Sequence, residues 1–271
     1  MRVSTQWASW RRLMTGAAGR ILGRKALWAL VAAAMVSAGA WWALAQRELP
    51  RIESRFTFAR IRFNTATDFG FGGFGRRGRG GGYQPWGHDF PASEENFMKI
   101  LAEVTKIDAN PGGHIVSFDN EEVFKYPIAY LCEVGFMQLT AKEIENMREY
   151  LLRGGFLIVD DFRGDRELNN FIYQMKMVFP DRSLEELPRS HPIFTCFYDI
   201  SNLNLPPPYS QYLTPVYLGM KDDDGRLMMV VDYNNDISDY WEWSANPLQS
   251  IENTNEAFKY GVNYVMYALT H

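Results

Sequence analysis

The sequence predicts an α/β fold in which helices cover both faces of an open, mostly parallel sheet, giving three layers. Short apolar runs rich in β-branched and aromatic residues alternate with longer segments that carry an apolar stripe at helical spacing. The run at 156–159 is apolar at every position, as is typical of a strand covered on both faces. Strands and helices that alternate at this length pair in parallel through right-handed crossovers.

The predicted strands follow one another along the chain as period-2 or continuous apolar runs. In the first part of the domain they lie at 56–63, 114–118, 128–132 and 156–159. Pro-Gly-Gly at 111–113 predicts a turn before the second of them. Two further strands, at 216–219 and 226–231, form a hairpin whose turn contains Asp224-Gly225.

The predicted helices are marked by caps and by apolar stripes. They lie at 93–106, 140–153, 169–179 and 254–269, with a short helical turn at 121–126. Ser93 is placed to cap the first of them. Thr140 and Glu143 form a capping box on the second, and Gly154 is placed for a left-handed stop.

The N-terminal 45 residues predict a signal peptide or a transmembrane anchor. Residues 26–45 are almost unbrokenly apolar over about one bilayer width, and six basic residues without an acid precede or begin this run. Ala43-Leu44-Ala45 has the form that signal peptidase cleaves, whereas Trp41 and Trp42 are typical of an uncleaved anchor. Both alternatives predict export, to a soluble periplasmic form or to one anchored in the inner membrane by residues 26–45. A linker at 46–56 and a single α/β domain at 57–271 follow.

A glycine-rich segment at 68–82 contains Gly-x-Gly-x-x-Gly at Gly70, Gly72 and Gly75. A dinucleotide site needs a helix that opens at the third glycine, but Arg-Arg-Gly-Arg-Gly-Gly-Gly follows. The segment is therefore interpreted as a low-complexity loop, and no cofactor is predicted.

The net charge limits the classes of partner that the sequence predicts. The first 45 residues hold six of the 28 basic residues and none of the 32 acidic ones, so the remainder carries 22 against 32, a net charge of -10. This negative net charge does not favour nucleic-acid binding.

Cys132 and Cys196 could pair after export or remain free and buried. Neither they nor the four histidines show metal-ligand spacing, so no metal is predicted.

Polar residues gather where the predicted strands end, which is where open α/β sheets bind ligands. The candidate ligand-binding residues are Glu133, Asp160, Asp161, Asn235, Asp236, Trp241 and Glu242. Carboxylates and amides interleaved with aromatic rings suit a carbohydrate ligand or a hydrolase with paired carboxylates. The structural alternative is that Asp160 caps the following segment and Asp161 pairs with Arg163 or Arg166.

Several segments together resemble a bacterial family of domains without a known function. They are Tyr126-Pro-Ile-Ala-Tyr-Leu, the run from Leu139 through Arg-Gly-Gly-Phe-Leu-Ile-Val-Asp-Asp161, Val178-Phe-Pro-Asp, His191-Pro-Ile-Phe and Phe197-Tyr-Asp. That family is similar to a divergent class I glutamine-amidotransferase-like domain, which is flavodoxin-like. The resemblance implies this fold but no established activity. Amidotransferases carry a nucleophilic cysteine where this chain has Asp160 and Asp161, so their chemistry is not expected.

The function expected from these observations is that of a non-catalytic binding or assembly module of the cell envelope. Its expected partners are a cell-envelope protein or a carbohydrate, together with the membrane if residues 26–45 are retained. The alternative is a periplasmic hydrolase or carbohydrate-active protein that uses the carboxylates at the strand ends. No catalytic residue is assigned by the sequence.

Overall fold

A computed structural model of the protein describes residues 55–65, 84–200, 202–210 and 212–271. The predicted signal or anchor segment at 1–45 and the predicted glycine-rich loop at 68–82 lie outside the described residues. Among the helices described, none combines the length and the apolar character needed to cross a membrane.

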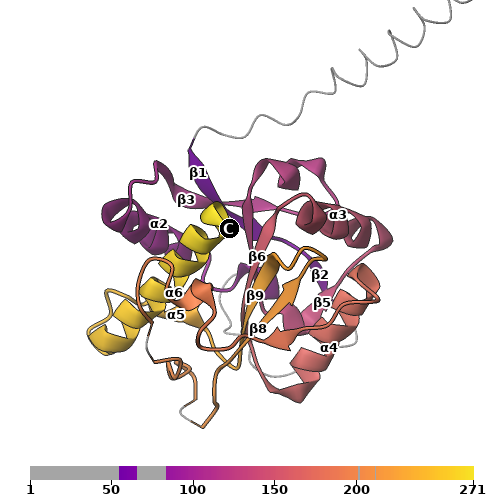
Figure 1. Ribbon diagram of the computed structural model, residues 1–271. Helices are drawn as coiled ribbons and strands as arrows, with labels where there is room; N and C mark the ends of the chain where they lie inside the picture. Colours follow the sequence, from indigo (N-terminus) through magenta and orange to yellow (C-terminus); the bar gives the residue numbers. More distant parts are fainter. Residues whose placement is uncertain (1–54, 66–83, 201, 211) are drawn as a thin grey trace, which may run out of the picture. The chain divides into compact units, whose positions relative to one another are not determined.

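A seven-stranded sheet forms the centre of the domain (Figure 1). Its strand order is β3-β1-β4-β6-β9-β8-β7, with parallel pairing from β3 through β9 and antiparallel pairing of β8 and β7 at one edge. The strands are β1 (Phe56–Ile61), β3 (Ala109–Val116), β4 (Ile128–Cys132), β6 (Phe156–Phe162), β7 (Glu185–Glu186), β8 (Val216–Lys221) and β9 (Leu227–Tyr233). β2 (Asn64–Thr65) and β5 (Met137–Gln138) form a separate two-stranded sheet. The predicted mostly parallel α/β sheet is confirmed, and it is compatible with a flavodoxin-like layout.

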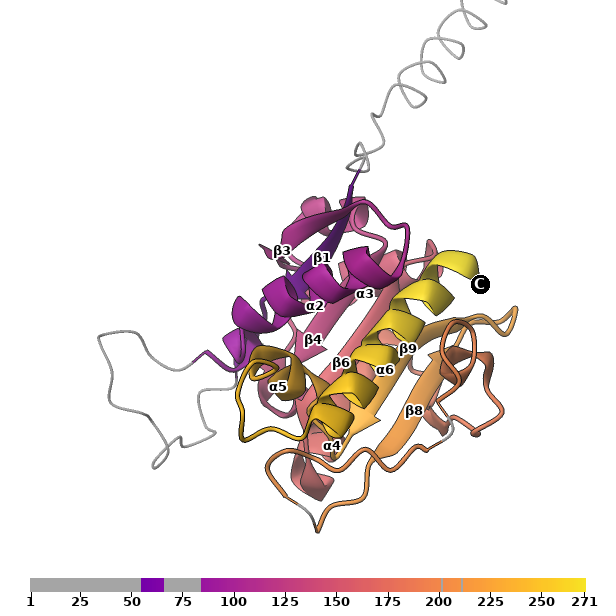
Figure 2. The same cartoon turned by 90° about the vertical axis from the view of Figure 1, so that its left-hand side faces the viewer.

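Helices cover both faces of the sheet, as the fully apolar strands require (Figures 1 and 2). One core cluster joins the sheet to α2, α5 and α6, and the other joins it to α3 and α4. The α-helices are α2 (Ala92–Val104), α3 (Ala141–Leu152), α4 (Gly164–Val178), α5 (Ile237–Glu242) and α6 (Ile251–Thr270). Short 3-10 helices are η1 (Pro85–Gly87), η2 (Glu121–Lys125), η3 (Val134–Phe136) and η4 (Pro192–Phe194).

Both ends of α3 are formed as the sequence predicts. The capping box between Thr140 and Glu143 is present, with both backbone N–H groups satisfied. Gly154 has φ +104°, a conformation in which a side chain would be strained, and it reverses the chain into β6. The helix-stop-strand unit is therefore built as predicted.

Several element boundaries differ from the prediction. Pro111-Gly112-Gly113 lies within β3 rather than before it, and Gly113 packs so closely on α2 that a Cβ atom would come within 2.8 Å of Glu94 Cγ. Ser93 does not cap α2, since the residue at the N-cap position is Pro91. Helix α4 begins at Gly164, five residues before the predicted start.

The two cysteines are far from forming a disulfide. Cys132 is buried at the end of β4, and Cys196 is half-buried beside α6, where its thiol donates to the carbonyl of Asn263 at 3.3 Å. Both are free thiols, so of the two alternatives left open by the sequence the unpaired one holds.

Candidate functional site

Left-handed backbone at non-glycine residues marks one edge of the sheet. Among the described residues, four non-glycine residues have positive φ: Asp89, Glu133, Asp161 and Asn234. Glu133 follows β4, Asp161 lies near the end of β6 and Asn234 follows β9, so three of them sit at the carboxyl ends of neighbouring parallel strands. Backbone strain of this kind persists where the surrounding structure holds it, and it gathers at functional sites.

Asp161 lies in a local distortion of β6. Its φ is +53°, and the pairing of β6 with β9 shifts register between Val159 and Phe162. The carbonyl of Asp161 accepts from Glu133 N at 3.0 Å, which fixes the distorted segment to the end of β4. The side chain is buried, and its Oδ2 lies 3.0 Å from Nδ1 of His88.

His88 and Asp89 reach the same edge from the loop that follows η1. A fully buried arginine, Arg60 of β1, holds this loop by donating to the carbonyls of Trp86 and His88 at 3.4 and 3.1 Å. Arg60 is itself fixed by an ion pair with Glu94 at 2.5 Å. Because the anchor is buried, the position of His88 and Asp89 is determined by the core.

Asp236 comes from the segment between β9 and α5. It is the N-cap residue of α5, and its Oδ1 accepts from Asp239 N at 2.9 Å and from Ser238 Oγ at 3.1 Å. Ser238 Oγ also lies 2.8 Å from Asp89 Oδ2, so the serine hydroxyl ties the two carboxylates together.

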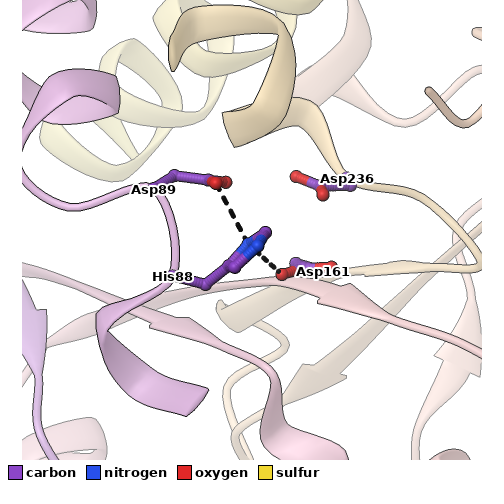
Figure 3. Close-up of side chains that lie close together, drawn as sticks. All are labelled: His88, Asp89, Asp161 and Asp236. Atoms are coloured by element: carbon purple, nitrogen blue, oxygen red, sulfur yellow. Dashed lines mark ion pairs between the residues drawn. The ribbon is translucent and has the colours of Figure 1, made fainter. Parts of the chain in front are cut away.

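These three segments bring four potential metal ligands into one cluster, shown in Figure 3. One ligand atom each from His88, Asp89, Asp161 and Asp236 lies within 4.8 Å of all the others. His88 Nδ1 is 3.0 Å from both Asp89 Oδ1 and Asp161 Oδ2. We call these four residues the central cluster.

A second group shares Asp89 with the central cluster. Asp89, Asp239 and Glu242 also offer ligand atoms within 4.8 Å of one another. Asp239 and Glu242 are half-buried on α5, whereas Asp89, Asp161 and Asp236 are buried. The acids thus extend from the buried cluster towards solvent along one side of α5.

In the central cluster three neighbouring carboxyl groups surround one basic side chain, the imidazole of His88. Contacts with Asp161 and then Asp89 raise the pKa of His88 to about 11. Burial tends to raise the pKa of Asp89, but the His88 contact outweighs it and leaves the pKa below its ordinary value. Burial and then the Asp161 charge raise the pKa of Asp236. A single imidazolium therefore balances only part of the negative charge.

The two outer acids have pKa values close to neutrality. Burial, followed by the Asp89 charge, raises the pKa of Asp239 to about 6 and that of Glu242 to about 7. Carboxyl groups in this range can take up and release protons near neutral pH.

Asp160, the neighbour of Asp161, has a different environment. It is fully buried and accepts from Tyr130 Oη at 2.8 Å, Ile237 N at 2.9 Å and Ser238 N at 3.0 Å. Burial and then Asp161 raise its pKa to about 7. Asp160 does cap a segment, as the structural alternative predicted, but that segment is α5 rather than the chain directly after β6. The predicted pairing of Asp161 with Arg163 or Arg166 is replaced by the ion pair with His88.

The remaining candidates from the sequence lie around the cluster rather than in it. Glu133 is half-buried at the end of β4. Asn235 is fully buried, and its Oδ1 accepts from Asp236 N at 2.9 Å. Trp241 is 1% exposed and stacks on Phe97 with ring centroids 4.4 Å apart, so its indole belongs to the core and is unavailable for stacking on a sugar.

His88, Asp89 and Asp239 were not among the residues selected from the sequence. His88-Asp89 follows the glycine-rich segment and precedes the first predicted helix, a stretch in which neither apolar periodicity nor ligand spacing is present. The available signal was the dipeptide itself, a histidine next to an aspartate just before a helix N-terminus.

Comparison with known proteins gives a family but no activity. A family model described as Domain of unknown function (DUF4159) matches residues 76–269, more than half of the chain. The matched region contains all four residues of the central cluster. No curated protein matches the sequence.

Proposed function

The chain belongs to the DUF4159 family, and we propose that its domain binds a divalent cation through His88, Asp89, Asp161 and Asp236 and uses the cation in hydrolysis. The observation that carries the proposal is the convergence of four ligand atoms, from three separate segments, within 4.8 Å of one another. An imidazole nitrogen with carboxylate oxygens suits first-row cations such as Mn²⁺, Fe²⁺ and Zn²⁺.

The charge balance of the central cluster supports a cation rather than a set of mutually satisfied side chains. Asp89, Asp161 and Asp236 are all buried, and His88, whose Nδ1 lies 3.0 Å from Asp161 Oδ2, is the one basic side chain among the four residues. Burying several carboxylates together is costly unless enough positive charge lies against them. A divalent cation supplies that charge for several acids at once.

The chemistry follows from the neighbouring acids. A bound divalent cation lowers the pKa of a coordinated water so that hydroxide forms near neutral pH. Glu242 and Asp239 border the cluster with pKa values of about 7 and about 6, which suits them to carry the proton that such a water releases. In this proposal Asp89, Asp161 and Asp236 hold the cation together with His88, which gives up its proton on binding, while Asp160 has only the structural role of binding the N-terminus of α5.

A second candidate is the binding or assembly module of the cell envelope. It is supported by an apolar groove of about 720 Å³ between α2 and α6, next to the 79% exposed Ile251. The groove includes Ile100, Val104, Tyr198, Phe258 and Val262. For either function we also propose that residues 1–45 direct export of the protein. We further propose that the α/β fold is of the glutamine-amidotransferase-like type.

The test is a calorimetric titration of the full chain with Mn²⁺ after treatment with a chelator. We expect Asp161→Asn and Asp236→Asn to weaken Mn²⁺ binding by more than about 100-fold, since loss of a direct ligand should exceed the loss caused by removing an outer-shell partner. Asp119→Asn is the matched control, because it makes the same change at an exposed acid outside the cluster.

The outcomes separate the two candidates. Hydrolysis of chromogenic ester, phosphoester or glycoside substrates that requires Mn²⁺ and is lost in Asp161→Asn supports the hydrolase. Cation binding without any such turnover contradicts hydrolysis and favours the binding module. A wild-type chain that binds no cation, or that binds it equally well without Asp161 and Asp236, overturns the proposed site.

A further inference from the structure

An arginine and a tyrosine border the central cluster on the side of β6. Arg163 follows β6 two residues after Asp161, and its guanidinium carbon lies 4.0 Å from the centre of the Tyr209 ring. No side-chain hydrogen bond or ion pair of Arg163 is present among the residues that the structure describes. Its fork of five N–H donors is therefore held in place by stacking and remains available.

Tyr209 contributes an enclosed hydroxyl next to the same acids. Its Oη is buried and makes no hydrogen bond with any described group. Burial, followed by the charges of Asp236 and Asp161, raises the pKa of Tyr209, so the hydroxyl stays protonated and able to donate. The buried hydroxyl thus belongs to the tyrosine on which Arg163, two residues after Asp161, is stacked.

The balance of charges at Arg163 is consistent with a position on the border of the cluster. Burial lowers the pKa of Arg163, but Tyr209 and then Asp161 outweigh it and leave the pKa above its ordinary value. Asp161, Glu167 and Glu133 all act on Arg163 through their charge, but none of them makes an ion pair with it among the described residues. A planar fork of donors beside a cation is the arrangement that recognises oxyanions.

We propose that Arg163 and Tyr209 bind an oxyanion, a phosphate or a carboxylate group, on the ligand that the cation of the central cluster engages. This inference rests on the proposed function, because the acids of the cluster repel an anion until a cation neutralises them. It assigns an anionic substrate to the proposed hydrolase. Arg163 and Tyr209 are then specificity residues, and Glu242 and Asp239 are left for proton transfer.

The experiment measures binding of inorganic phosphate and of acetate to the full chain by calorimetry, with and without saturating Mn²⁺. We expect Mn²⁺ to strengthen anion binding in the wild type. Arg163→Ala should weaken it roughly 10- to 100-fold, since a hydrogen bond to a charged group is the main loss. Tyr209→Phe keeps the ring under the guanidinium and should weaken it only several-fold.

The matched control is Arg166→Ala, which removes the same charge from an exposed position on α4. Affinity for phosphate but not acetate identifies a phosphate ligand, and the reverse identifies a carboxylate. Anion binding that is equal in wild type, Arg163→Ala and Arg166→Ala overturns the inference while leaving the cation site intact, because Mn²⁺ binding is measured separately on each variant.

Failure of the cation site itself gives a distinct result. If the wild type binds no Mn²⁺, the proposed function fails. Phosphate binding to the cation-free chain then tests whether Arg163 and Tyr209 bind an oxyanion. Weakening in Arg163→Ala but not in Arg166→Ala then supports an oxyanion site that works alone. Equal affinities in the two variants overturn it.

Discussion

Asp160 and Asp161 are adjacent in the sequence and both buried, yet their environments are opposite. Asp160 accepts three hydrogen bonds, from Tyr130 and from two backbone N–H groups of α5. Asp161 has left-handed backbone, and its Oδ2 contacts a single described group, His88 Nδ1 at 3.0 Å. The same residue type at the same depth thus binds the helix of the fold in one case and, in the other, lies in the central cluster for which we propose cation binding.

The backbone creates this difference. In a regular strand successive side chains point to opposite faces, so a regular β6 would turn Asp161 towards the apolar layer of α3 and α4. The register shift after Val159 and the φ of +53° redirect Asp161 to the edge where His88 lies. The number of donors around each carboxylate therefore distinguishes Asp160, which is held by the fold, from Asp161, the proposed cation ligand, whereas neither burial nor sequence position does.

The largest expected effect comes from removing the structural acid. Asp160→Ala should lower the free energy of unfolding by about 3 kcal/mol, because it removes the acceptor of the first two N–H groups of α5 and leaves the Tyr130 hydroxyl without an acceptor. Urea denaturation at neutral pH measures it. Asp160→Asn, which keeps one acceptor oxygen, should lose clearly less.

The control for this prediction is the neighbouring residue. Asp161→Asn should change the free energy of unfolding by less than half as much as Asp160→Ala, since it weakens one ion pair, with the half-buried His88, and keeps a side-chain oxygen in its place. Equal losses at the two positions would show that the distinction between the two aspartates is false.

Asp232, at the end of β9, extends the comparison to a third buried aspartate. It is fully buried, Tyr264 Oη donates to its Oδ1 at 2.7 Å, and its Oδ2 accepts nothing. Burial, then the Asp160 charge, raises the pKa of Asp232 in the folded chain. The proton that it retains stabilises the folded state fully below the unfolded pKa of about 3.9, and this stability is lost as pH rises towards the folded pKa.

Asp232→Asn should therefore gain stability relative to wild type as pH rises from about 4 to 8. The gain is about 1.4 kcal/mol for each pKa unit that separates the folded and unfolded states. Urea denaturation of both proteins across this range measures it. The same change at the exposed Asp224, Asp224→Asn, serves as control. A constant difference for Asp232→Asn would contradict the expected retention of the proton.

The parts of the fold that local chemistry determines could be predicted from the sequence. The capping box at Thr140, the stop at Gly154 and the turn at Asp224-Gly225 each act within a few residues, and the elements that they delimit are present. Pro111-Gly112-Gly113 has the composition of a turn but lies in β3, because packing of Gly113 against α2 outweighs local preference.

The candidate site could be predicted only where strand ends mark it. Asp161 and Asp236 follow buried strands, and Glu242 was selected with them. His88 and Asp89 come from a loop whose position depends on the buried Arg60. Nothing in the sequence pattern of β1 indicates that this arginine is buried or that it binds the loop. Helix α5 could not be predicted because its six residues are too few to show an apolar stripe. Besides the local N-cap Asp236, its N-terminus is bound by Asp160, 77 positions earlier in the chain, and no local pattern reveals such a contact.

The smallest predicted effect tests the backbone at Asp161 itself. Asp161→Gly and Asp161→Asn both lose the carboxylate that pairs with His88, but only Asp161→Gly removes the left-handed strain, so in the cation-free chain it should exceed Asp161→Asn by about 1 kcal/mol in unfolding free energy. Asp161→Asn removes the charge but keeps the side chain, and comparing the two by urea denaturation isolates the contribution of the backbone. If Asp161→Gly is less stable than Asp161→Asn, the left-handed conformation is not strained. A stabilised Asp161→Gly that has lost Mn²⁺ binding would mean that stability has been given up at this position for function.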